Sequence, residues 1–377
     1  MNKNFTAVIG LVLLLAGAAA ARLCASTPAP KTSDANVSSE FVSGRLVSAK
    51  PVLENSSLAI EALEFLVLNG KLKGRTVKTK NYLWDDPAYN TFLKKGDRAT
   101  LKINYNQEAG EIESVRIKGY SRGRTFILFF LAFGLLLFAV IGHRAATVLG
   151  AMGFNICLFT FVMIPILKTG FNPAAAVFLF SLLSAGVTLL LITGFSKKTF
   201  AAAAGTLGSL VLASALALIF MKSAHISGFY SEGARRIMAM SRAGNIADID
   251  FFLLTVAGTM LAALGMAVDV SVGVASFINE LHEERGDMGW GELSLKGISV
   301  GSDMLATMIN SLIFVFAGMS LPLVLNARIC HISFLRFINY EAVSGVILQS
   351  LLASFVLIFT IPATSFAAAY LFAGDKK

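Results

Sequence analysis

Residues Phe251–Ile278 read FFLLTVAGTMLAALGMAVDVSVGVASFI, an apolar run that contains one carboxylate, Asp269. A second run, GISVGSDMLATMINSLIFVFAGMSLPLVL, extends from Gly297 to Leu325 and contains Asp303. Both runs exceed the roughly 20 apolar residues that a helix needs to cross a bilayer. A carboxylate at the centre of such a helix costs about 2.5–3.5 kcal/mol on insertion scales, so it is retained where it faces water, an ion or a partner group. Asp269 and Asp303 are therefore the first candidates for functional residues.

On a helix, the residues around Asp269 form one face of small side chains. Its members recur every three or four positions: Gly258, Ala262, Gly265, Asp269, Gly273 and Ser276. Small residues allow a neighbouring helix to approach closely. The pattern therefore predicts helix packing at Gly258, Gly265 and Gly273, with Asp269 at the same interface.

The helix around Asp303 carries a polar stripe. It consists of Ser299, Asp303, Thr307 and Asn310, which are four, four and three residues apart. Hydroxyl, carboxylate and amide oxygens can bind a cation or a polar solute. We therefore predict a transport or ion-coupling site between the two helices, and a hydrogen-bond network without a permeating solute is the alternative. Glu280, in an acidic cluster just beyond the first run, is a further candidate for an ion site.

The overall composition indicates a multi-pass membrane protein. The 377 residues are 55% hydrophobic and only 15% charged, with a mean hydropathy of +0.70, whereas soluble domains carry about 25% charged residues. The net charge of +9 comes largely from the stretch between Lys71 and Arg124. Because this stretch lies outside the apolar runs, it is interpreted as a solvated basic domain, and no nucleic-acid partner is expected.

Motifs for cofactor or metal chemistry are missing from the sequence. The three cysteines and four histidines are scattered, His-Glu-x-x-His does not occur, and there is no glycine loop with lysine for a nucleotide phosphate. An intramembrane aspartyl protease would need two aspartates on separate spans, one as acid and one as base. Its Gly-x-Gly-Asp motif is not met, since the chain reads Val300-Gly301-Ser302-Asp303. We expect no cofactor, no metal and no enzyme activity, and keep the protease as a remote alternative.

The pattern along the chain predicts an anchor, a linker, a small β domain and a polytopic region. Residues 1–25 are a signal anchor or signal peptide, 26–37 a linker, 38–121 a small β-barrel-like domain resembling an OB fold, and 122–377 the transmembrane domain. The expected spans are 126–142, 146–167, 173–194, 199–221, 250–278, 298–325 and 342–372, which with the first segment gives about eight. Within the β domain, Asn69-Gly70 predicts a type I′ hairpin turn. The polar segment Lys222–Asp250 predicts either an interfacial helix or a connecting loop.

The two carboxylate-bearing segments also resemble the YibE/F-like family of bacterial membrane proteins. The first carries Gly265, Asp269, Ser276 and Glu280, and the second carries Gly301, Asp303, Thr307 and Asn310. Further matches are IPILKTGFNP at Ile164–Pro173 and GFSKKT at Gly194–Thr199, whereas Ser302 and Ser311 depart from the pattern. The resemblance implies an N-terminal anchor, an exported β domain and a polytopic remainder in the bacterial plasma membrane. It marks these residues as the motif residues of the family but assigns no role to any of them.

Together these features predict a mostly α-helical permease or transporter-like protein, coupled to protons or cations, with an unknown small solute or ion as substrate. Residues 26–121 are expected to be extracytoplasmic, the lipid bilayer is the expected partner, and a homo-oligomer is left open. The alternative is a non-transporting scaffold or sensor that presents the β domain outside the membrane.

Overall fold

The computed structural model describes residues 37–373 apart from 56–57, 85–89, 107–111 and 245. The expected N-terminal anchor and the linker up to residue 36 lie outside the described residues. The chain divides into two compact units, one within Ser26–Gly142 and the other containing His143–Lys377. Each unit is described by itself.

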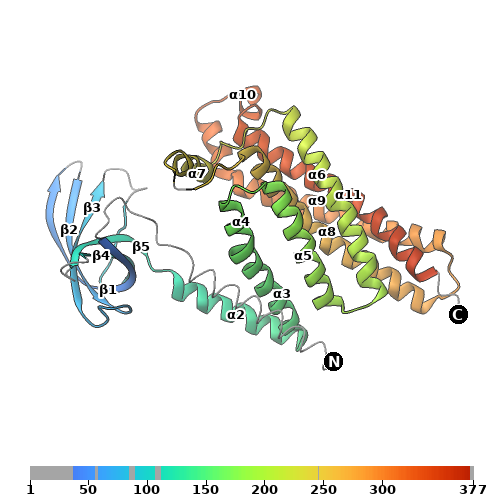
Figure 1. The fold of residues 1–377 in the computed structure, drawn as a ribbon, viewed down its shortest axis with the longest axis horizontal. Coiled ribbons are helices and arrows are strands. Elements are labelled where there is room, and N and C mark those ends of the chain that lie inside the picture. Colours follow the sequence, from blue (N-terminus) through green and yellow to red (C-terminus); the bar gives the residue numbers. More distant parts are fainter. Residues whose placement is uncertain (1–36, 56–57, 85–89, 107–111, 245, 374–377) are drawn as a thin grey trace. The chain divides into compact units, whose positions relative to one another are not determined.

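The first unit contains a five-stranded antiparallel sheet of order β3-β2-β1-β4-β5 (Figure 1). The strands are β1 Val37–Asn55, β2 Leu58–Val67, β3 Thr76–Trp84, β4 Arg98–Asn106 and β5 Ile112–Tyr120. The hydroxyl of Thr79 on β3 donates to the carbonyl oxygen of Val115 on β5 at 2.6 Å, so the two edge strands meet. The sheet is therefore nearly closed, which confirms the predicted β-barrel-like domain.

Alternation along the strands fills the interior of this barrel. Leu63, Phe65, Leu101 and Ile103 are spaced two apart on β2 and β4 and are completely buried, as expected when side chains alternate between the two faces of a strand. Gly44 is needed where β1 crosses them, because a Cβ atom there would lie 2.8 Å from Cδ1 of Leu101.

The predicted two-residue turn at Asn69-Gly70 is wrong. β2 ends at Val67 and β3 begins at Thr76, so the connection has eight residues. Gly70 has a positive φ of 81°, but Asn69 does not share it, and a type I′ turn requires both. Asn69 instead accepts a hydrogen bond from the backbone N–H of Ser43 at 2.6 Å, which ties the longer loop to β1.

Seven helices among the described residues are long and apolar enough to cross a membrane. They are α2 Gly123–Ile141, α3 Arg144–Leu158 continued by η2 Phe159–Met163 and α4 Ile164–Lys168, α5 Pro173–Thr193, α6 Lys197–Ser223, α8 Phe251–Glu284, α9 Trp290–Ile329 and α11 Glu341–Ala373. Each overlaps one of the seven apolar segments expected between residues 126 and 372. α2 belongs to the compact unit of the sheet, and the other six lie in the second unit.

Local sequence explains several helix ends. Asn172 caps α5 by accepting from the N–H groups of Ala174 and Ala175, and Asp250 caps α8 through the N–H of Leu253 at 2.9 Å. The π-helical turn of η2 lies directly before Pro165, whose ring cannot continue a regular hydrogen-bond ladder. α9 and α11 continue through Pro322 and Pro362.

Two short helices connect the spans of the second unit. α7, Glu232–Arg242, is capped by Ser231, so the helical alternative for the segment between residues 222 and 250 is confirmed. α10, Phe334–Ile338, lies between α9 and α11.

The core of the second unit lies where α6, α8 and α11 pack together (Figure 1). Gly205 on α6 allows the closest approach, because a Cβ atom there would lie 2.8 Å from Cβ and 3.0 Å from Cα of Thr364 on α11. Thr364 donates to Ser271 on α8 at 3.1 Å, and Ser209 shares a hydrogen bond with Thr360 at 2.6 Å. The three helices are thus joined by buried hydroxyls as well as by apolar contacts.

Candidate functional site

The site predicted from the sequence is carried by an antiparallel hairpin of α8 and α9. A Cβ atom at Gly297 would lie 2.5 Å from Cδ1 of Ile278, and one at Gly273 would lie 2.7 Å from Cε of Met304. These two approaches fix the level of one helix against the other. Asp269 lies about one turn before Gly273, and Thr307 lies about one turn after Met304. Because Gly273 meets Met304 and the two helices are antiparallel, Asp269 stands near the level of Thr307.

The face of α8 that carries Asp269 is not the face that packs into the bundle. Val270, Ser271 and Val274 are buried against α6 and α11, whereas Gly258, Gly265 and Asp269 are exposed. A Cβ atom at Gly258 or Gly265 would meet no atom within 4 Å among the described residues. Three glycines were predicted to lie at helix contacts, and of these Gly273 has a close neighbour, Met304. For Gly258 and Gly265 a helix contact stays a prediction.

The polar stripe of α9 is also uncovered. Ser299, Asp303, Thr307 and Asn310 are all exposed. The hydroxyl of Thr307 donates to the carbonyl oxygen of Met304 in its own helix at 2.9 Å. Within the described part of the chain, the side chains of Asp269, Asp303 and Asn310 make no hydrogen bond or ion pair with another residue. Their oxygens are available to water or to a ligand, and a network that joins them directly is not formed.

Glu280 does not share this level of the hairpin. It is exposed near the end of α8, eleven residues after Asp269, which corresponds to about 16 Å along a helix. The structure therefore brings Asp269, Asp303, Thr307 and Asn310 onto adjoining faces of two helices in contact, and leaves Glu280 about three turns away.

Sequence reasoning missed the buried hydroxyls of the core. Besides the hydrogen-bonded Ser209, Ser271, Thr360 and Thr364, the structure buries three hydroxyls without a described partner: Ser181, Thr206 and Ser365. A signal was present, since Ser and Thr recur at helical spacing on α11. Spacing alone could not distinguish this buried stripe from the exposed one on α9.

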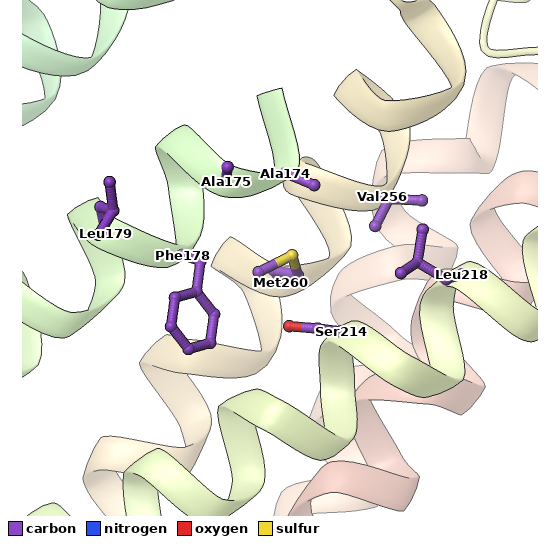
Figure 2. Close-up of a pocket in the computed structure, with 8 residues that line it drawn as sticks. All are labelled: Ala174, Ala175, Phe178, Leu179, Ser214, Leu218, Val256 and Met260. Atoms are coloured by element: carbon purple, nitrogen blue, oxygen red, sulfur yellow. The ribbon is translucent and has the colours of Figure 1, made fainter. Parts of the chain in front are cut away.

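One groove within the bundle is apolar. Its lining comes from α5, α6 and α8 (Figure 2), and its volume is about 400 Å³. The lining residues are Ala174, Ala175, Phe178, Leu179, Ser214, Leu218, Val256 and Met260. The single hydroxyl, that of Ser214, donates to the carbonyl oxygen of Leu210 at 2.7 Å. Neither Asp269 nor Asp303 lines this groove. Its apolar lining suits a hydrocarbon chain and not a polar solute.

Comparison with known proteins agrees with this architecture. The YibE/F-like protein family matches residues 129–374, which include every described span of the second unit. The YibE/F family N-terminal domain matches residues 55–120, which cover strands β2 to β5. No curated protein and no solved structure matches the chain. Since the first match alone covers more than half of the sequence, the chain belongs to the YibE/F-like protein family.

Proposed function

We propose that this protein is a permease of the bacterial plasma membrane that moves a small polar solute or a cation along the adjoining faces of α8 and α9. The observation that carries the proposal is the placement of Asp269 and Asp303, which lie on contacting membrane-length helices and are not covered by another described helix of the second unit.

The physical argument starts from the cost of leaving these groups in hydrocarbon. An ionised carboxylate facing lipid is unfavourable by several kcal/mol, on the order of 2.5–3.5 at the centre of a span. With no ion pair or hydrogen bond inside the described chain to offset this cost, the groups need water or a ligand. Two carboxylates, a hydroxyl and an amide form an oxygen-rich set suited to a cation or to coupling with proton transfer.

Small residues beside the carboxylates support the same function. Gly258 and Gly265 place no side chain on the face of Asp269. The helix backbone there leaves room for water or a solute to approach the carboxylate. The proposal places residues 26–121 outside the cytoplasm. A second copy of the chain is one way to complete the walls of the path.

Aqueous access to the two faces tests the proposal. Single cysteines would replace Gly265, Thr307 and Asn310 in a chain lacking Cys24, Cys157 and Cys330, and intact cells and inverted vesicles would be treated with a membrane-impermeant thiol reagent. Phe355→Cys on α11 is the control, because Phe355 is 54% exposed in the chain but its surroundings are apolar.

We expect labelling at all three test positions and none at the control. Labelling that slows when Na⁺ or K⁺ is added, and no longer responds to the cation in Asp269→Asn, would identify a cation path. A folded protein that is labelled at none of the three positions from either side would refute the aqueous path.

The scaffold or sensor alternative rests on the nearly closed sheet, which forms a separate compact unit. It predicts a dry α8–α9 face together with a partner retained by the full-length chain through the sheet. The same labelling experiment therefore distinguishes the two functions.

A further inference from the structure

A second cavity lies at the end of the bundle where α6 ends and α8 and α11 begin. Its volume is about 410 Å³, within the range of small-molecule sites. It is lined by Phe229, Tyr230, Arg235, Asn339, Tyr340, Glu341 and Ala342. Asp269 is eighteen residues into α8, about 27 Å along the helix, so this cavity is separate from the face discussed above and does not depend on the proposed transport function.

Glu341 fixes one wall of the cavity. Its Oε1 accepts hydrogen bonds from the backbone N–H groups of Ser227 at 2.6 Å and Gly228 at 2.9 Å, and from the Ser227 hydroxyl at 2.8 Å. Its negative charge is therefore matched by three donors of the 224–231 connection. Because these bonds converge on Oε1, Glu341 holds the loop in shape, and its Oε2 accepts from the same Ser227 hydroxyl at 3.0 Å.

Gly228 makes this arrangement specific. Its φ is +82°, and a Cβ atom there would collide with the backbone carbonyl of Phe251. The adjacent ring of Phe229 packs on that of Phe251 with 4.6 Å between centroids. The wall is thus formed before any ligand arrives, which lowers the cost of binding.

Aromatic groups supply the remaining surface. Burial, and then the charge of Glu341, raises the pKa of the Tyr230 hydroxyl above its ordinary value, so this group stays protonated and can donate. Tyr340 is half exposed at the rim. Tyrosines of this kind combine a flat apolar surface with a hydroxyl donor.

Arg235 is the one basic side chain in the lining. Its Nε donates to the carbonyl oxygen of Phe229 at 3.5 Å, and it makes no ion pair with any described carboxylate. The neighbouring Arg236 differs, because it binds Glu232 with its Nη2 at 2.6 Å and its Nε at 3.1 Å. Arg235 therefore brings an unneutralised guanidinium with several N–H groups to the cavity, a geometry suited to phosphate or carboxylate.

We propose that this cavity binds an organic anion, with its phosphate or carboxylate on Arg235 and its apolar part against Phe229, Tyr230 and Tyr340. Two sources share this chemistry, the headgroup of an anionic lipid and a water-soluble organic anion. The cavity is bordered by the start of two membrane-length helices, where either source can reach it.

The test uses the full-length protein in detergent and two probes, phenyl phosphate and short-chain phosphatidylglycerol. Affinities would be measured by isothermal titration calorimetry for the parent chain, Arg235→Gln and Arg236→Gln. Both arginines are exposed on the same helix, and each substitution removes one positive charge, so the pair separates a local contact from a general electrostatic effect.

We expect Arg235→Gln to weaken binding of at least one probe by about tenfold or more, with Arg236→Gln close to the parent. Loss for phenyl phosphate would identify a site for a soluble anion, and loss for phosphatidylglycerol alone a headgroup site. Equal weakening by both substitutions, or binding of neither probe to the parent chain, would overturn the proposal.

Discussion

Substitution of Gly205 by alanine tests how closely α6 and α11 pack. The added Cβ atom would lie 2.8 Å from Cβ of Thr364, and the ordinary contact distance is at least 3.4 Å, so the helices must separate locally by 0.6 Å. Rotating the threonine hydroxyl away cannot relieve this contact, because Cα of Thr364 is also only 3.0 Å away. A gap of this size forfeits roughly a quarter or more of each dispersion contact along the interface.

Overpacking of this kind costs about 1–3 kcal/mol, and the better helix propensity of alanine returns about 0.5–1 kcal/mol. We therefore expect a net destabilisation of up to about 2.5 kcal/mol, or a fall of the unfolding midpoint by up to about 10 °C for a unit of this size. The shift would reach the candidate site, since α11 also contacts α9 where Ile361 meets Gly301.

The measurement is the thermal midpoint of the detergent-purified protein, followed by the folded fraction in size-exclusion chromatography after heating. Gly208→Ala is the matched control, because its Cβ atom would lie 3.7 Å from Phe359, an ordinary contact. It should be neutral or slightly stabilising. A Gly205→Ala protein as stable as Gly208→Ala would refute the close approach of the two helices. Full rescue by a second change, Thr364→Ala, would show that the γ atoms of Thr364, and not its Cβ and Cα, were in the way.

Three further changes test the local geometry by the same midpoint measurement. Gly70→Ala should destabilise the protein more than Gly74→Ala. Both glycines have a positive φ, but of the two only Gly70 would bring its Cβ atom against a neighbour, Oε1 of Glu40 at 2.5 Å. Equal effects of the two substitutions would contradict the crowding at Gly70. Asp250→Ala should cost about 1 kcal/mol by removing the N-cap of α8, and no change would argue against the cap. Glu341→Ala should cost more, roughly 1–3 kcal/mol for each N–H left without an acceptor, whereas an unchanged midpoint would mean that the carboxylate does not hold the loop.

The proposed path and the proposed anion site place different demands on the chain. The α8–α9 face offers oxygens and negative charge, whereas the cavity at Arg235 offers N–H donors and aromatic surface. A cation would therefore be held near the middle of α8 and an organic anion beside its N-terminal end. Variants at Asp269 and Arg235 should affect their own ligand alone unless α8 moves as a unit between them.

Hydrophobic length determined most of the architecture without reference to the structure. Apolar runs of twenty or more residues have few stable alternatives to a membrane-length helix, so the spans follow from the sequence alone. The stretch of residues 38–121 likewise predicted a small β-barrel-like domain from its sequence. β2 and β3 do form an antiparallel hairpin, but the tight turn predicted at Asn69 is wrong. The dipeptide favours a two-residue turn, whereas the contact with Ser43 and the close approach to β1 select a longer loop.

Which stripe of each helix is covered was decided by tertiary structure. Periodicity located a small-residue face on α8, where Gly273 meets Met304 but Gly258 and Gly265 have no neighbour within 4 Å among the described residues. The bundle buries the opposite face around Ser271, against α6 and α11. The cavity at Glu341 shows the same limit, since Ser227 and Glu341 are 114 residues apart. Local spacing fixes what a helix offers on each side, but the side that is buried depends on the shape of partners distant in the chain.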